Sequence, residues 1–259
     1  MQVFVHDCTA SQAHAIKDII DRLNRCQNEF QFVLHRKENS LNDSSPVSWA
    51  GAVEHVRNSV RADQFVVGII ESPLEYNWFS FTNPQANCSV ITTHGWDVIS
   101  YLPIESFIGY EIVMNLQEAL IQWEDYSFAH LEPLGCINDM CGYKPHISFK
   151  IRTGDVCPAC METWKEKLTE AQIGAFQALL DTIRGVALGR EPSSTVPVEE
   201  QSVFPVAVLW RLLRQETNSA RKFLRLLDLF DMAVRYSVIC LVAESLYLCN
   251  YSGTQNRLN

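Results

Sequence analysis

Four cysteines stand in two pairs near the middle of this 259-residue chain. Cys136 and Cys141 have four residues between them, and Cys157 and Cys160 have two, one of which is a proline. Two short chelating turns joined by a hairpin-sized excursion suit the tetrahedral thiolate coordination that Zn²⁺ prefers. Four protein ligands would fill the coordination shell, which is typical of a structural rather than a catalytic site. The spacing therefore predicts one structural zinc ion per chain, bound by Cys136, Cys141, Cys157 and Cys160.

Two alternatives for this segment stay open from the residues alone. Four thiolates can also hold an iron–sulfur cluster. His146, which lies between the two pairs, could replace one of the cysteines as a ligand. The stretch 146–150 is expected to form a β-ribbon between the pairs, and Met161–Leu168 is expected to form a helix directly after Cys160.

The other five cysteines show no chelating spacing; they are Cys8, Cys26, Cys88, Cys240 and Cys249. The odd total of nine would leave one thiol unpaired in any set of disulfides within the chain. The first residues resemble a strand rather than a signal peptide. The most apolar stretch, 226–248, is interrupted by charged side chains, unlike a membrane-spanning helix. We therefore expect a cytoplasmic protein with reduced cysteines and no membrane segment.

The composition is that of an ordinary globular protein, with 47% hydrophobic and 20% charged residues. The 21 basic and 30 acidic side chains give a net charge of −9, which disfavours a broad surface for binding phosphate groups. Arginines gather on two predicted helices, around 57–61 and 211–225. A solvated helix face accounts for them, so a nucleic-acid-binding zinc protein is an alternative and nucleic acid is not the expected partner.

The order of the predicted elements indicates an α/β fold. Three strands alternate with two helices at the start of the chain, which is typical of a parallel sheet with right-handed crossovers. The strands are expected at 2–5, 30–34 and 64–70, and the helices at 10–25 and 48–61. Two further strands are expected at 78–81 and 88–93, the second of them antiparallel at the edge, and a long helix at 104–122.

Two domains are predicted. Residues 1–168 form an α/β domain that includes a zinc knuckle at 134–164, and residues 169–259 form an α-helical module. The module begins with a helix at 169–186 and contains two amphipathic helices with apolar residues at helical spacing, namely Val206, Leu209, Trp210 and Leu213, then Phe223, Leu226, Leu227, Phe230 and Val234. These two helices could close on the first domain or join two chains in a homodimer.

Several stretches between about residues 60 and 165 resemble archaemetzincin-type zincins. The run at 62–74 is similar to the strand before their active site, 87–93 to their edge strand, and 109–115 to part of their active-site helix. The segments Gly135–Cys141 and Cys157–Cys160 resemble their zinc-binding cysteine tail. The resemblance implies a zincin-like scaffold, an α/β sheet with flanking helices, that keeps a structural four-cysteine zinc site.

The sequence departs from that family at the residues that would bind catalytic zinc. Such peptidases carry H-E-x-x-H, in which two histidines one turn apart bind the metal and the glutamate activates water. Here the helix reads Gly-Tyr-Glu-Ile-Val-Met at 109–114, so Glu111 stands without a histidine, and Gly135 takes the place of a third ligand. The hypothesis is a pseudo-peptidase, a non-catalytic and zinc-stabilised module that binds a partner protein.

The C-terminal stretches 203–211 and 222–244 resemble helical modules of bacterial signalling and conflict proteins, which would make the chain an adaptor in a signalling or defence system. The alternative function is that of a metal-dependent hydrolase with non-standard ligands. His94, Glu111 and His130 are the candidate residues for that activity.

An aromatic group at 76–81, together with Trp96 and Tyr101, is unusually dense. Packing in the core is the simpler interpretation. The functional alternative is a peptide-binding groove beside the edge strand, of which Trp78 and Trp96 are expected to be the exposed members.

Overall fold

The computed structural model describes residues 1–37, 41–42, 44–58, 60–100, 102–122, 128–131 and 134–189, together with residues 230 and 234. The chain divides into two compact units, Met1–Pro192 and Ser193–Asn259. The predicted C-terminal helices lie outside the described residues, apart from Phe230 and Val234, so the homodimer predicted through these helices stays a prediction. Tyr101, Cys240 and Cys249 also lie outside the described residues. No helix in the described ranges is both long and apolar enough to cross a membrane.

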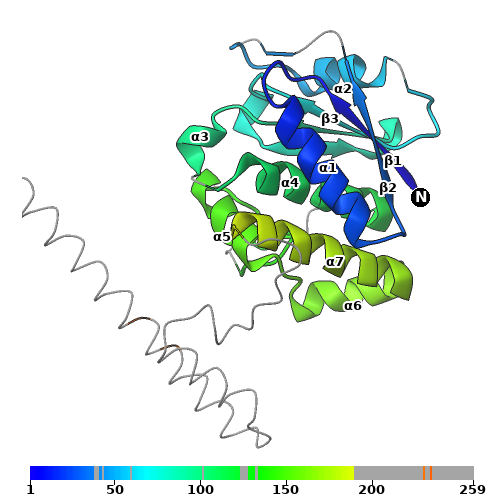
Figure 1. The fold of residues 1–259 in the computed structure, drawn as a ribbon, viewed down its shortest axis with the longest axis vertical. Helices are drawn as coiled ribbons and strands as arrows, with labels where there is room; N and C mark the ends of the chain where they lie inside the picture. Colours follow the sequence, from blue (N-terminus) through cyan, green and yellow to red (C-terminus); the bar gives the residue numbers. More distant parts are fainter. Residues whose placement is uncertain are drawn as a thin grey trace, which may run out of the picture. The chain divides into compact units, whose positions relative to one another are not determined.

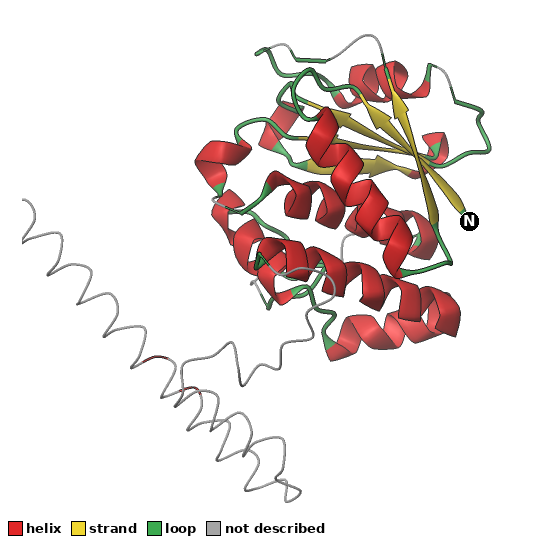
Figure 2. Cartoon of the chain, viewed as in Figure 1, coloured by secondary structure: helices red, strands yellow, loops and turns green. Residues whose placement is uncertain are grey.

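In the described part of the first unit, five strands form one mixed sheet (Figures 1 and 2). They are β1 (Gln2–Asp7), β2 (Gln31–Arg36), β3 (Val66–Ile70), β4 (Ser80–Asn83) and β5 (Cys88–Thr92). Their order is β2-β1-β3-β5-β4; all neighbours are parallel except β4, which is antiparallel to β5. Every residue of β3 and β5 is buried, as in strands covered on both faces. The predicted α/β fold is confirmed.

Helices cover both faces of this sheet (Figure 1). On one face α1 (Ala13–Cys26) and α4 (Ile104–Ile121) pack against the strands and each other, and the other face carries α2 (Trp49–Arg57). A Cβ at Gly109 of α4 would stand 2.8 Å from a side-chain carbon of Ile19. The glycine therefore lets α4, the helix that carries Glu111, lie close against α1.

The helix α7 (Glu170–Ala187) belongs to the core of the first unit. A capping box formed by Thr169 and Gln172 begins it at the predicted position. Phe176, Leu179 and Ile183 are buried in the same apolar cluster as residues of α1 and α4. The predicted boundary at 168 thus falls inside a compact unit that extends to Pro192.

The edge of the sheet differs from the prediction. The sequence assigned the antiparallel edge to 88–93, but β5 lies between β3 and β4, and β4 forms the edge. The burial of the strands gives the physical reason. All residues of β5 are buried, which favours an interior position, whereas three of the four residues of β4 are partly exposed.

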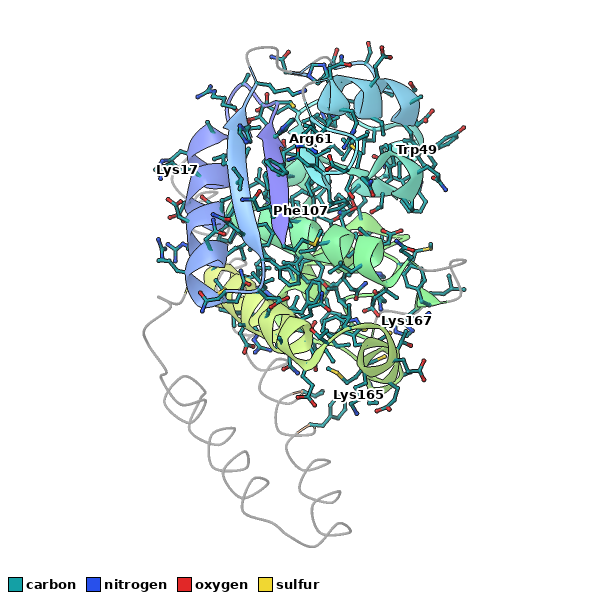
Figure 3. The ribbon with its side chains drawn as sticks, turned by 90° about the vertical axis from the view of Figure 1, so that its right-hand side faces the viewer. Lys17, Trp49, Arg61, Phe107, Lys165 and Lys167 are labelled. Carbon is teal, nitrogen blue, oxygen red and sulfur yellow. The ribbon has the colours of Figure 1, made fainter. Side chains whose placement is uncertain are left out.

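After α4 the chain forms the short helices η4 (Lys144–His146), α5 (Ile147–Thr153) and α6 (Pro158–Lys167). The predicted β-ribbon at 146–150 is wrong, because Ile147, Lys150 and Ile151 are buried at helical rather than alternating spacing. The helix predicted after Cys160 is confirmed as α6. Its Lys165 and Lys167 lie at the surface, whereas Phe107 of α4 lies in the core (Figure 3). Three shorter turns complete the described elements: η1 (Glu75–Asn77), η2 (Pro84–Ala86) and α3 (Trp96–Ile99).

Candidate metal centre and adjoining groove

Four side chains with metal-binding atoms are gathered at one place; they are His130, Cys136, Cys157 and Cys160. Their ligand atoms all lie within 4.8 Å of one another. Nε2 of His130 is 3.3 Å from Sγ of Cys157 and 3.3 Å from Sγ of Cys160. Cys136 and Cys160 are buried, and the other two are half-buried. These four residues are termed the metal group.

The distances fit a tetrahedron around one zinc ion. Bonds of roughly 2.3 Å to sulfur and 2.0 Å to nitrogen place a sulfur and a nitrogen ligand roughly 3.5 Å apart and two sulfurs roughly 3.8 Å apart. The observed 3.3 Å and the upper limit of 4.8 Å bracket these values. Three thiolates and an imidazole are donors that Zn²⁺ prefers. The metal group is therefore placed to hold a single zinc ion whose four ligands all come from the protein.

Short backbone pairings bring His130 next to the cysteines. Its N–H donates to the C=O of Asn138 at 3.0 Å, and its C=O accepts from the N–H of Met140 at 2.8 Å. Cys136 is bridged in turn to Asp155, just before Cys157. Between these pairings Gly135 adopts a φ of +83°, a left-handed conformation that glycine tolerates.

A buried chain of hydrogen bonds leads to the thiol of Cys160. Nε1 of Trp164 donates to Oε1 of Gln117 at 3.0 Å, Nε2 of Gln117 donates to Oδ1 of Asn138 at 2.9 Å, and Nδ2 of Asn138 donates to Sγ of Cys160 at 3.2 Å. An indole can only donate, so it fixes the direction of both amides. Hydrogen bonds from Cys136 and, after it, from Asn138 lower the pKa of Cys160, which favours the thiolate that binds a metal.

The structure brings three of the four predicted cysteine ligands together with His130, and it places Cys141 elsewhere. Cys141 lines an adjoining cavity, where burial raises the pKa of its thiol to about 11. The spacing of the cysteines in pairs led to the prediction of Cys141 as a ligand. The backbone pairing of His130 with 138–140 is what places an imidazole beside the other three cysteines. The sequence feature that could have indicated His130 as a member of the group is its position six residues before Cys136. His146, the other histidine considered as a ligand, is exposed and packs edge-on against Tyr143.

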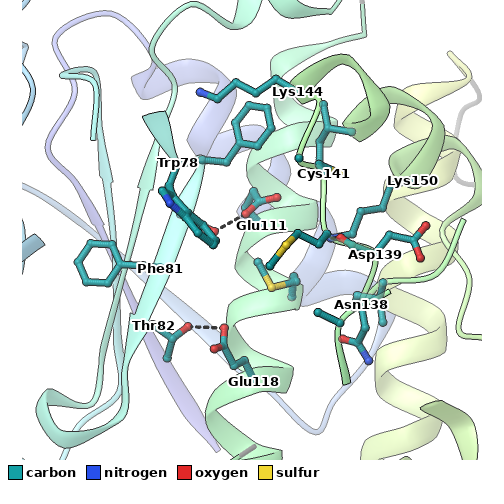
Figure 4. Close-up of a pocket in the computed structure, with 18 of the residues that line it drawn as sticks. Trp78, Phe81, Thr82, Glu111, Glu118, Asn138, Asp139, Cys141, Lys144 and Lys150 are labelled. Atoms are coloured by element: carbon teal, nitrogen blue, oxygen red, sulfur yellow. Dashed lines mark hydrogen bonds between the residues drawn. The ribbon is translucent and has the colours of Figure 1, made fainter. Parts of the chain in front are cut away.

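A cavity of about 370 Å³ lies beside the edge strand (Figure 4). One side is formed by β4 and the two residues before it, and the helix α4 contributes Glu111, Met114 and Glu118. The segment 137–142 and Lys144 form the other side. This cavity is termed the groove, and the segment 137–142 is termed its wall.

Two carboxylates of α4 that line the groove are hydrogen-bonded directly to β4. Glu111 is 2% exposed and accepts a hydrogen bond from Oγ of Ser80 at 2.5 Å, and Glu118 accepts one from Oγ1 of Thr82 at 2.9 Å (dashed lines in Figure 4). Burial raises the pKa of both carboxyl groups; for Glu111 the charge of Lys150 opposes this effect only in part. Phe81, between the two hydroxyls, points to the opposite face of the sheet and stacks on Trp49.

The rim of the groove is aromatic and includes Tyr76, which is 79% exposed, and Trp78, which is 39% exposed. Tyr76 and Asn77 have φ values of 57° and 59°, a conformation that costs free energy in residues other than glycine. The predicted exposure of Trp78 is confirmed. That of Trp96 is wrong, because Trp96 is 5% exposed, stacks on Phe107 and donates through Nε1 to the C=O of Leu102.

The three residues proposed for a hydrolase do not converge. Glu111 lies in the groove, His130 belongs to the metal group, and His94 is an exposed residue between β5 and α3 that does not line the groove. Within the described ranges, none of the residues that line the groove is a histidine.

No protein-family model matches the sequence, and a search of curated proteins finds no match. Among solved structures, the chain is similar to an archaemetzincin from Archaeoglobus fulgidus in complex with malonate, at 9% identity and a TM-score of 0.43, covering 63% of this chain and 99% of that one. A zinc-dependent peptidase from Methanocorpusculum labreanum matches at 9% identity and a TM-score of 0.42, with the same coverage. Similarities this distant carry no conclusion about the activity of this chain.

Proposed function

We propose that this chain is a non-catalytic, zinc-stabilised module that binds an extended segment of a partner protein in the groove. The observation that carries this proposal is the sheet edge along the groove. β4 is the last strand of the described sheet on that side, and Ser80, Phe81 and Thr82 line the cavity. A peptide that joins such an edge gains main-chain hydrogen bonds and places alternate side chains in pockets.

The register of β4 leaves backbone groups for such a partner. The N–H of Thr92 donates to the C=O of Phe79 at 2.8 Å, which makes these residues a hydrogen-bonded pair. Hydrogen-bonded and non-bonded pairs alternate along an antiparallel ladder. The backbone groups of Phe81 therefore point to Val90, and those of Ser80 and Thr82 point away from β5.

Trp49 adds a polar group suited to a peptide. It lines the groove, and its indole N–H is a buried donor that has no hydrogen-bond partner among the described residues. An unsatisfied buried donor costs free energy, which a ligand carbonyl would recover. The exposed rings of Tyr76 and Trp78 offer contact area at a small cost in side-chain entropy.

The chemistry of the groove favours binding over hydrolysis. A catalytic zinc needs protein ligands and an open position for water, and no histidine is available from the described groove lining. In the metal group the protein supplies all four ligands, which suits a structural role. The proposed setting, a cytoplasmic protein of bacterial signalling or defence, rests on the sequence.

The proposal is tested by selecting a displayed library of random linear peptides on the zinc-loaded protein and measuring the affinity of the selected peptide by fluorescence polarisation. Thr82→Pro removes a backbone N–H that points away from β5 and leaves the ladder intact. We expect this change to weaken binding by at least about tenfold, or about 1.4 kcal/mol.

Thr82→Val is the matched control. It loses the same hydroxyl contacts to Asn115 and Glu118 but keeps the N–H, so its affinity should stay within about threefold of wild type. A selection that yields no specific peptide, or an equal loss in both variants, would contradict the proposal.

A further inference from the structure

We infer that zinc in the metal group holds the groove in its binding shape, so that zinc and peptide bind cooperatively. The inference rests on the proposed function, because it concerns the same groove. By thermodynamic linkage, a metal that tightens peptide binding is itself bound more tightly in the presence of peptide, by the same factor.

One segment of chain belongs to both sites. Cys136 is a member of the metal group, and the residues that follow it, 137–142, are the wall of the groove. His130 is attached to the same wall by backbone hydrogen bonds to Asn138 and Met140. Two of the four metal-binding residues are therefore connected directly to the wall, one through the chain and one through hydrogen bonds.

Asn138 contacts both sites with a single side chain. It lines the groove, and its amide donates to Sγ of Cys160 while accepting from Gln117 of α4. A metal ion in the metal group would fix the position of Sγ of Cys160 and so hold the acceptor of this hydrogen bond in place. Loss of the metal therefore weakens one of the hydrogen bonds that position this part of the wall.

The two sides of the groove differ in how they are held. β4 is fixed by the sheet, whereas the wall lies outside the helices and strands and is tied by isolated bridges at Asp139 and Cys136. Lys150 adds a hydrogen bond from Nζ to the C=O of Asp139 at 2.9 Å. Four metal–ligand bonds would be the strongest constraint on this segment. Removal of the metal should therefore loosen the wall and leave β4 in place.

Hydrogen–deuterium exchange of the zinc-loaded protein against protein stripped with a chelator tests this without any peptide. We expect exchange at 137–142 to be about tenfold faster in the stripped protein, and exchange in β4 and β5 to change by less than about twofold. Equal exchange at 137–142 in the two forms would overturn the inference.

The second arm measures the affinity of the selected peptide for the same two preparations by calorimetry. We expect binding about tenfold tighter with zinc. Equal affinity would overturn the inference and leave the proposed function standing. Absence of binding to both forms would count against the proposed function, and the exchange arm would still decide the inference.

A variant tests the inference even if removal of zinc by the chelator unfolds the whole first unit. Gln117→Leu keeps the metal-binding residues and changes no residue of the groove lining, but it frees Asn138 from α4. At saturating zinc we expect peptide binding about fivefold weaker, since one contact that positions the wall is lost. Wild-type affinity in this variant would count against the inference.

Discussion

The metal group and the groove share a wall, yet they are assembled from the sequence in opposite ways. The four residues of the metal group lie between 130 and 160 and are held together by local backbone pairings. The groove combines Trp49, β4, α4 and the wall, which are distant in sequence and meet because the sheet order places β4 at the edge. A local site leaves a spacing pattern in the sequence, whereas a site made by topology does not.

The two regions also differ in how far their polar groups are satisfied. Around the metal group the amides of Gln117 and Asn138 are bonded in a fixed direction to Cys160. The groove keeps an indole N–H without a described partner and the buried carboxyl of Glu111, whose pKa is raised by burial. Asp139 of the shared wall is intermediate, since Oδ2 accepts from the N–H of Cys136 and Oδ1 has no partner among the described residues. Saturated networks stabilise a fold, and unsatisfied groups mark places where stability is given up for binding.

Removal of a metal-binding side chain should have the largest effect. Cys157→Ser should lower the free energy of unfolding by at least about 3 kcal/mol, since structural zinc contributes directly to folding, and Tm by about 10 °C. Thermal unfolding followed by circular dichroism measures the change. His130→Ala should act in the same direction.

Cys141→Ser is the control that separates the two regions. Because Cys141 lines the groove, its change should cost less than about 1 kcal/mol and leave one zinc per chain. If Cys141→Ser destabilised the protein as much as Cys157→Ser, and His130→Ala did not, the assignment of these residues to different regions would be broken.

The next largest effect concerns the support of the metal group. Gln117→Leu should weaken zinc binding about tenfold, because hydrogen-bond partners of the ligands orient them and tune their affinity. Competition with a chelating dye measures this. Gln177→Leu makes the same change on the exposed face of α7 and should leave zinc affinity unchanged. Equal zinc affinities in the two variants would show that Gln117 does not support zinc binding.

In the groove, Trp78→Ala should weaken binding of the selected peptide about fivefold, or about 1 kcal/mol, by removing a half-exposed aromatic contact. Zinc content should not change. Val98→Ala shortens an exposed apolar side chain that does not line the groove and serves as the control. If both variants bind as wild type does, the aromatic rim has no role in recognition.

The smallest effect concerns the pH dependence of stability. Burial raises the pKa of Glu111 above its value in the unfolded chain, so its contribution to stability is present at low pH and is lost as pH rises through the folded-state pKa. Glu111→Gln keeps an acceptor for Ser80 and carries no charge. Its stability relative to wild type should therefore increase from about pH 4 to pH 7.

Denaturant unfolding at several pH values measures this difference, with the exposed Glu166→Gln as control. A free energy of unfolding of Glu111→Gln that falls relative to that of wild type as pH rises would show that the carboxylate is stabilised in the groove.

The sequence predicted what depends on local patterns. The fully apolar run at 66–70 marked a buried parallel strand, and Ser48 and Thr169 marked helix starts that the structure confirms. The cysteine spacing selected Cys136, Cys157 and Cys160, three of the four residues of the metal group. The place of His130 beside these cysteines escaped prediction, because it depends on which segments pair through their backbones.

The groove was harder to predict for the same reason. Trp78 and Trp96 look alike as aromatic residues near a strand end, and only the packing on Phe107 shows that Trp96 is a core residue. The assignment of the edge to 88–93 treated the two final strands as equivalent, although the uniform burial of β5 separates them. Such errors arise where tertiary contacts, rather than local propensity, decide the outcome.

X-ray absorption at the zinc edge of the loaded protein tests the central claim most directly, since it counts the sulfur and nitrogen ligands. The geometry of His130, Cys136, Cys157 and Cys160 predicts one zinc ion with three sulfur ligands at about 2.3 Å and one imidazole nitrogen at about 2.0 Å. In His130→Ala the nitrogen contribution should disappear, and in Cys141→Ser the spectrum should stay as in wild type. Four sulfur ligands in the wild-type protein, with one of them lost in Cys141→Ser, would contradict the account.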